Sequence, residues 1–206
     1  MITKKSVQYY ISNIYKENKT ILFTTSTGFG KYLHYFRKPL LEDLLESKKY
    51  CLIICPLLQI IDHLQENFFN EIKEKLGTNL YDIIKNRTKF SVEFKNGSLI
   101  EFKTLQKMKE YTYNNKEESD ILYIDSISRY PRNNIQSISY LLSSFKKVII
   151  IDDEIKRFDN NSEQLIEQLK LRHPFYSFHM NLISDLIIEF RKLKLKQLRK
   201  KCKFMI

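Results

Sequence analysis

The chain has 206 residues and a net charge of +11, and its 43% hydrophobic and 29% charged residues are typical of a folded soluble domain and exclude a disordered one. No apolar run reaches membrane-spanning length and no secretory signal is present, which excludes a membrane protein and predicts an intracellular location. The three cysteines match no metal-binding spacing and form no even disulfide set, which favours a reducing compartment.

The first predicted elements are a helix over residues 6–15 and a buried strand over Ile21–Phe23. A polar turn follows, carrying two of the chain's four glycines, and it reads Ser26-Thr27-Gly28-Phe29-Gly30-Lys31. Lys31 stands where the next helix is expected to begin. These are the parts of a phosphate-binding loop, because glycines let the backbone N–H groups at a helix N-terminus approach an anion.

The turn departs from the full phosphate-loop pattern G-x-x-x-x-G-K-[ST] at two positions. Thr25 stands in place of the first glycine, and Tyr32 follows the lysine. What remains, Thr27 to Lys31, resembles the T-G-x-G-K core of helicase-type and packaging-type motors. An ordinary strand–turn–helix connection with a solvated lysine is the alternative interpretation.

The elements after the turn alternate between helix and strand. A helix is expected over about residues 31–47 with an interruption near Pro39, because the residue before a proline resists the helical region. Tyr50–Cys55 is a continuous apolar run, which predicts a central parallel strand buried on both faces. A long amphipathic helix follows over residues 57–76, with Gly77 as its expected C-cap. Residues 89–104 alternate apolar and polar around Asn96-Gly97, which predicts a β-hairpin.

The second half of the chain completes an α/β pattern. Asp120–Asp125 and Val148–Glu154 are apolar runs that end in acids and predict two further buried strands. Helices are expected over residues 134–144, 161–171 and 180–206. The alternation predicts a P-loop NTPase-like parallel sheet flanked by helices, with an inserted β-hairpin and a basic C-terminal helix. We expect residues 1–179 to form the ATPase-like domain and residues 180–206 to form a helix packed on it.

Either acidic strand end could supply the aspartate that holds Mg²⁺ in a phosphate-loop ATPase, where a glutamate normally follows and orients the attacking water. Asp125 is followed by Ser126, whereas Asp152 is followed by Asp153 and Glu154. A metal strand ending at Asp152 would require two further strands, and after residue 159 the sequence offers helices and one short aromatic stretch. We therefore place the metal at Asp125 and treat the 148–154 strand as its sensor-like neighbour. Two core strands that happen to end in acids are the alternative.

Segments in the order just described resemble the ATPase domain of large terminase subunits, the DNA-packaging motors of tailed phages and related viruses, and more distantly superfamily 2 helicases. They are Thr27–Lys31, Ile53–Pro56, Phe94–Ile100 and Asp120–Pro131. Gln8 precedes them, where the family commonly has a glutamine that reads adenine. The Asn-Gly-Ser turn in the third segment is the feature that separates terminases from helicases. The resemblance covers about residues 8–154, roughly three quarters of the chain.

The resemblance implies ATP and Mg²⁺ as cofactors and DNA as the partner, with further copies of the chain or packaging and processing proteins as additional partners in a host cell. It assigns Asp125 to the metal and to catalysis, and Glu154 to catalysis if its side chain reaches across from the adjacent strand. The nucleotide would contact Gln8, Thr27, Gly28, Phe29, Gly30, Lys31 and Tyr32.

Two departures from the family pattern concern the chemical step. Tyr32 replaces the threonine or serine that ligates Mg²⁺, and Ser126 replaces the catalytic glutamate. Because Lys31 and the loop amides provide most of the phosphate contact, we expect nucleotide binding to survive and hydrolysis to be impaired, so the sequence leaves open whether the protein is an enzyme. An active helicase-like ATPase that uses Glu154 and a non-catalytic DNA-binding or assembly module are the alternatives.

The positive charge is concentrated at the C-terminus. Residues 190–206 hold eight of the 35 basic residues and no acid, which leaves 27 basic and 24 acidic residues in the rest of the chain. Such a cluster is typical of contact with a polyanion, although a solvated helical face is the alternative. The cations expected to contact nucleic acid are Arg191, Lys192, Lys194, Lys196, Arg199, Lys200, Lys201 and Lys203.

Overall fold

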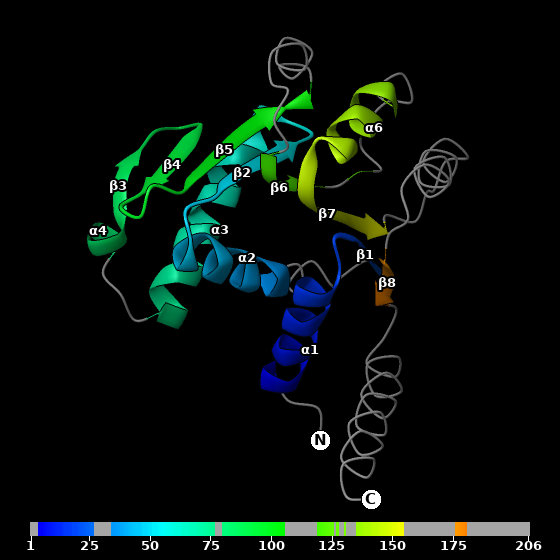
Figure 1. Cartoon of the computed structure of the whole chain (residues 1–206), viewed down its shortest axis with the longest axis horizontal. Coiled ribbons are helices and arrows are strands. Elements are labelled where there is room, and N and C mark those ends of the chain that lie inside the picture. Colours follow the sequence, from blue (N-terminus) through cyan, green and yellow to red (C-terminus); the bar gives the residue numbers. More distant parts are fainter. Residues whose placement is uncertain are drawn as a thin grey trace, which may run out of the picture.

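The computed structural model describes residues 4–26, 34–76, 80–105, 119–125, 127, 130, 135–154 and 176–180 (Figure 1). The described helices are α1 (Lys4–Glu17), α2 (His34–Glu46), α3 (Leu58–Leu76), α4 (Leu80–Ile83) and α6 (Ile135–Ser143). The described strands are β1 (Thr20–Ser26), β2 (Tyr50–Cys55), β3 (Ile84–Arg87), β4 (Ser91–Phe94), β5 (Leu99–Thr104), β6 (Ser119–Ile124), β7 (Phe145–Glu154) and β8 (Tyr176–Met180).

The described strands form one mostly parallel sheet in the order β3-β4-β5-β2-β6-β7-β1-β8. All neighbours from β5 to β8 are parallel, whereas β3 and β4 add an antiparallel margin. The predicted α/β class with an inserted hairpin is therefore confirmed. The chain leaves β1, β2, β6 and β7 at the same edge, here called the carboxyl edge, which is where ligands bind in open α/β sheets.

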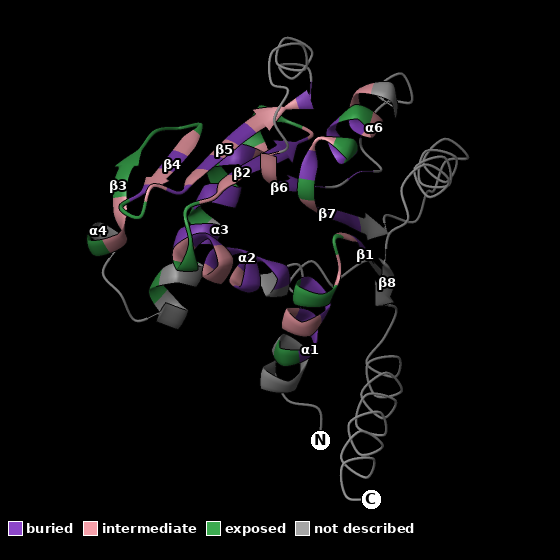
Figure 2. Cartoon of the chain, viewed as in Figure 1, coloured by how far each residue is buried: buried purple, intermediate pink, exposed green. Residues whose placement is uncertain are grey.

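Helices cover both faces of the sheet because side chains alternate along each strand. Figure 2 shows the resulting buried strands at the centre of the molecule. On one face, alternate strand residues pack under α1, α2 and α3, and the rings of Phe23 and Phe36 lie 4.9 Å apart between their centres. On the other face, residues such as Leu122 and Ile150 pack under α6. Burial on both faces explains why the central strands read as continuous apolar runs.

The predicted hairpin is confirmed, and its turn requires the glycine. Gly97 has a φ of 85°, a conformation that residues with a Cβ rarely adopt. A Cβ at this position would lie 3.3 Å from the Cδ of Lys48. The sequence signal at Asn96-Gly97 therefore identified the turn, and the structure adds the backbone conformation of its glycine.

Several expectations about the elements were wrong. Helix α2 continues through Pro39, because the burial of Phe36, Leu40 and Leu44 along its inner stripe outweighs the roughly 3 kcal/mol that an internal proline costs. Tyr176–Met180 forms β8 beside β1, so Met180 belongs to a strand and not to the C-terminal helix. The strand β3 and the short helix α4 were not predicted. The helices expected over residues 161–171 and 181–206 and the cap at residue 77 lie outside the described residues.

Candidate functional site

Two buried aspartates lie at the carboxyl edge on adjacent strands. Asp125 follows β6 directly, is 8% exposed, and donates its backbone N–H to the carbonyl of Ile54 at 3.0 Å. Asp152 lies near the end of β7, is 1% exposed, and pairs in register with Thr24 of β1. The prediction that these two acids lie on neighbouring strands at one edge is confirmed.

The strand order places β7 between β6 and β1. Asp152 therefore lies on the strand next to β1, and Asp125 lies one strand further away, which corresponds to about 10 Å between β6 and β1 at ordinary strand spacing. In the part of the chain that the structure describes, β8 alone follows β7, one strand fewer than a metal strand ending at Asp152 would require. The choice of Asp125 over Asp152 as the metal ligand stays a prediction, because Lys31 lies outside the described residues.

Two neutral side chains, Cys55 and Tyr130, are close enough to Asp125 to be influenced by its charge. Cys55 ends β2 beside it, and burial raises the pKa of the Cys55 thiol, with the Asp125 carboxylate raising it further. Burial also raises the pKa of the Tyr130 hydroxyl, and Cys55 and Asp125 add to the effect. Both groups therefore stay protonated at neutral pH. Cys55 is completely buried, which agrees with the strand predicted over Tyr50–Cys55.

A buried arginine lies on the helix side of the same edge. Arg37 on α2 is 5% exposed, and its guanidinium carbon lies 5.6 Å from the centre of the Phe68 ring. Burial raises the pKa of the Tyr123 hydroxyl. The positive charge of Arg37 opposes this rise and the negative charge of Asp125 adds to it, so both side chains influence the same hydroxyl. Arg37 was not singled out from the sequence. Its signal was its place one helical turn before Leu40 on the inner stripe of α2.

The carboxylates at the carboxyl edge are the kind of ligand that a magnesium–nucleotide complex takes from a protein. Among the residues that the structure describes, no three His, Cys, Asp or Glu side chains gather as a metal cage. Mg²⁺ in nucleotide sites needs one or two carboxylates and takes its other ligands from phosphate oxygens and water. Asp125, with Asp152 on the next strand, meets this smaller requirement.

The remaining predicted site residues are placed only in part. Gln8 lies in α1. Glu154 ends β7 in register with Ser26, the residue before the predicted loop. The side chains of Gln8 and Glu154 are outside the described part. The loop residues Thr27–Tyr32 and the eight C-terminal cations lie outside the described residues as well. The structure thus brings the end of β1, Asp125 and Asp152 to one edge and leaves the loop itself as a prediction.

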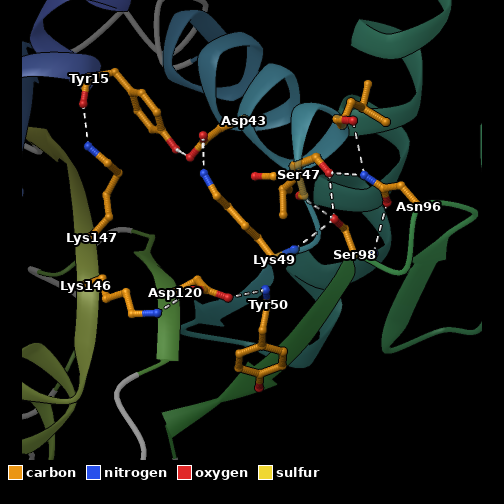
Figure 3. A network of polar contacts seen from close by, with 12 residues as sticks. Tyr15, Asp43, Ser47, Lys49, Tyr50, Asn96, Ser98, Asp120, Lys146 and Lys147 are labelled. Carbon is orange, nitrogen blue, oxygen red and sulfur yellow. Dashed lines mark hydrogen bonds and ion pairs between the residues drawn. The ribbon is translucent and has the colours of Figure 1, made fainter.

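The Asn-Gly-Ser turn lies at the opposite, amino edge of the parallel strands, where it closes the end of α2 (Figure 3). The fully buried Ser98 hydroxyl lies 2.6 Å from the carbonyl of Leu44 and 3.0 Å from that of Ser47, and it accepts the N–H of Lys49 at 3.0 Å. Asn96 donates its side-chain N–H to the Leu44 carbonyl at 2.7 Å. These contacts satisfy carbonyls that have no partner within the helix, so the turn holds α2 in place.

Further polar contacts in Figure 3 tie the starts of other strands to the helices. Lys147 on β7 donates to the carbonyls of Tyr15 at 2.5 Å and Asn18 at 2.9 Å, which closes the C-terminal end of α1. The Tyr15 hydroxyl donates to Asp43 at 2.8 Å, and Lys49 pairs with the same carboxylate. These contacts at the amino edge therefore have a structural role.

Ser98→Ala should reduce the free energy of unfolding by about 2 kcal/mol, because it leaves buried partners of the hydroxyl without a hydrogen bond. Denaturant unfolding of the purified protein measures the loss. Ser143→Ala is the matched control, because the exposed Ser143 hydroxyl contacts one carbonyl of its own helix, that of Tyr140 at 2.7 Å, and its loss should cost less than about 0.5 kcal/mol. Equal losses in the two variants would refute the structural role of the turn.

Comparison with known proteins finds likeness in structure. No protein-family model and no curated protein sequence matches the chain. The large terminase of a thermophilic bacteriophage matches with a TM-score of 0.57 and 10% identity over 85% of this chain and 44% of that chain. The large terminase ATPase domain of Thermus phage P74-26 matches with a TM-score of 0.57 and 12% identity over 95% and 91%. The N-terminal domain of the DNA packaging ATPase of bacteriophage phi29 matches with a TM-score of 0.55 and 13% identity over 89% and 96%.

At these identities the comparisons show the fold, which is the α/β fold of terminase ATPase domains, as the sequence motifs predicted. The chain spans less than half the length of the first of these proteins, the large terminase of the thermophilic bacteriophage. Of the helices described, none is long and apolar enough to cross a membrane.

Proposed function

We propose that the chain is a terminase-like nucleotide-binding protein that acts on DNA in viral genome packaging or processing, with impaired ATP hydrolysis. The observation that carries the proposal is the strand order β8-β1-β7-β6-β2, which brings Asp125, Asp152 and the end of β1 to one edge. The matched P74-26 domain is a large terminase ATPase domain, and the matched phi29 domain belongs to a DNA packaging ATPase.

In this proposal the phosphates of ATP lie in the segment between β1 and α2. The backbone amides of residues 28–31 and the Lys31 ammonium contact the phosphates, and Gln8 on α1 contacts the adenine. Asp125 holds Mg²⁺, which when bound neutralises phosphate charge. Asp125 is buried, and an ion–carboxylate contact is stronger at a buried site than in water.

Titration of the purified protein with Mg²⁺ and fluorescent ATP, combined with a phosphate-release assay, tests the proposal. We expect saturable ATP binding and no phosphate release above that of Lys31→Ala, with or without DNA. Absence of ATP binding would contradict the nucleotide site. If the chain binds DNA but does not bind ATP, it is an assembly or DNA-binding module. The eight C-terminal cations are the proposed DNA contact, and copies of the chain are proposed to assemble on DNA.

An active ATPase is the second candidate, favoured by the place of Glu154. Its backbone pairs in register with Ser26 at the end of β1, directly before the predicted loop. A carboxylate from this strand end could orient the attacking water, which is the role of the glutamate that Ser126 replaces. DNA-dependent phosphate release that Glu154→Gln abolishes would establish this candidate and refute impaired hydrolysis.

Restoring the two departures from the family pattern should increase phosphate release. The double variant Tyr32→Thr, Ser126→Glu supplies a hydroxyl for the metal and a carboxylate for the attacking water. Because one such group typically contributes about 100-fold, we expect at least a tenfold increase over the wild-type rate. The matched control is Tyr32→Thr, Ser126→Gln, which has the same size without the carboxylate. If both double variants bind ATP and release phosphate equally slowly, these two positions are not the cause of the impairment.

A further inference from the structure

The turn between β3 and β4 lies at the carboxyl edge of the sheet, the same edge as Asp125. Strand β4 is antiparallel to β5, and β5 is parallel to β2, so the residues before β4 lie where β5 ends. The N–H of Phe102 near the end of β5 donates to the carbonyl of Phe90 at 2.8 Å, which fixes this position. Three strand spacings separate β4 from β6, which is about 14 Å. Residues 87–90 are here called the basic turn.

The basic turn is held rigidly by a buried glutamine. Gln65 on α3 is 2% exposed, and its side-chain N–H groups donate to the carbonyls of Thr88 at 3.1 Å and Lys89 at 2.9 Å. Within the turn, Thr88 donates its backbone N–H to the carbonyl of Ser91 at 2.9 Å, and the Thr88 hydroxyl accepts the N–H of Phe90 at 3.2 Å. A loop ordered in advance loses little conformational entropy when it binds a partner.

The side chains of the basic turn combine cations with an exposed aromatic ring. Arg87 stacks on the Phe69 ring, with its guanidinium carbon 3.9 Å from the ring centre. The Lys89 ammonium lies 5.9 Å from the centre of the Phe90 ring and 3.4 Å from the Asp62 carboxylate. Both members of this ion pair are more than half exposed, so the pair contributes little and Lys89 can exchange Asp62 for a stronger anion.

Phe90 is 40% exposed, although most large apolar residues of the described chain are buried. Cations on an edge strand such as β3 often prevent edge-to-edge association, and this role is enough to explain why Lys85 is a cation. It does not explain an exposed aromatic ring beside a lysine on a rigid turn. Aromatic rings next to cations are how proteins bind single-stranded nucleic acid, because unpaired bases stack on the ring and phosphates contact the cation.

We propose that the basic turn is a contact site for single-stranded nucleic acid, with a base stacked on Phe90 and a backbone phosphate at Lys89. The proposal rests on the proposed function for the class of partner, but on different residues from the C-terminal cations. A duplex gains the phosphate contact alone, because its bases are already stacked inside the helix.

Fluorescence anisotropy of the full chain with labelled single-stranded and duplex oligonucleotides, over a range of salt concentrations, tests this site. Phe90→Ala should weaken single-strand binding about fivefold or more without changing the salt dependence, and Phe90→Tyr should retain the wild-type affinity. Lys89→Ala should lower the slope of log affinity against log salt by about 0.7 for the single strand. Lys85→Ala is the matched control, because it removes an exposed, ion-paired cation from the other end of β3 and should change neither quantity.

The outcomes separate this site from the proposed function. If the wild-type chain binds no nucleic acid, the DNA arm of the proposed function and the basic-turn site fail together. If the wild type binds, but Phe90→Ala and Lys89→Ala behave like Lys85→Ala, the basic turn is not a nucleic-acid contact and its exposed ring becomes a candidate protein contact. Equal losses of single-strand and duplex affinity in Phe90→Ala would also overturn the base-stacking role.

Discussion

Lys31→Ala is expected to abolish ATP binding while leaving the fold intact, because the ammonium group is proposed to face the phosphates and not the core. Among the side chains that the structure describes, Phe36 is the first of α2 in the core, and it follows the substituted residue in the chain. Equilibrium titration with fluorescent ATP measures the loss, and thermal unfolding confirms the fold.

The matched control for this variant is Lys38→Ala. Lys38 is a partly exposed cation on α2, with its ammonium 3.5 Å from the Glu42 carboxylate, and its removal should leave ATP binding unchanged. A Lys31→Ala protein that binds ATP as tightly as the Lys38→Ala protein would remove the phosphate-loop interpretation.

Deletion of residues 191–206 is expected to remove most of the DNA affinity and its salt dependence. The deleted segment carries eight cations and no acid, and phosphate contacts by such cations release counterions. The wild-type chain should therefore lose on the order of 10³-fold in affinity between low and physiological salt, with little sequence preference, whereas the truncated chain should show a shallow dependence. A variant with the eight cations replaced by glutamine keeps the length and the apolar residues, and it should match the deletion. A truncated chain with wild-type affinity and salt slope would show that the segment is a solvated face.

The central strands could be predicted from the sequence because strands buried on both faces consist almost entirely of apolar residues. Tyr50–Cys55 and Val148–Ile151 have almost no polar residue, and both form inner strands. The hairpin was equally accessible, since Asn96-Gly97 specifies a turn conformation locally. Strand β3 is exposed and mostly polar, so no apolar run marks it in the sequence. Strand β8 is a short stretch whose pairing with β1 depends on residues far away in the chain.

The sequence predicted the two acidic residues of the candidate site but not the residues around them. Asp125 and Asp152 end apolar runs, and parallel strands bring such ends to one edge. Arg37 and Tyr130 become relevant because both are buried at the same edge as Asp125, which follows from packing between α2, the strands and the chain after β6. The contacts of Asn96 and Ser98 with the end of α2 span about fifty residues, so the sequence showed the turn but not that it holds a helix.

A crystal structure with Mn²⁺ and a non-hydrolysable ATP analogue tests the central claim most directly, because the anomalous signal of Mn²⁺ locates the metal without ambiguity. The account predicts phosphates between β1 and α2 in contact with Lys31, and the metal bound to Asp125 directly or through one water. Phosphates away from the segment between β1 and α2, or a metal bound to Asp152 with Asp125 out of reach, would contradict it.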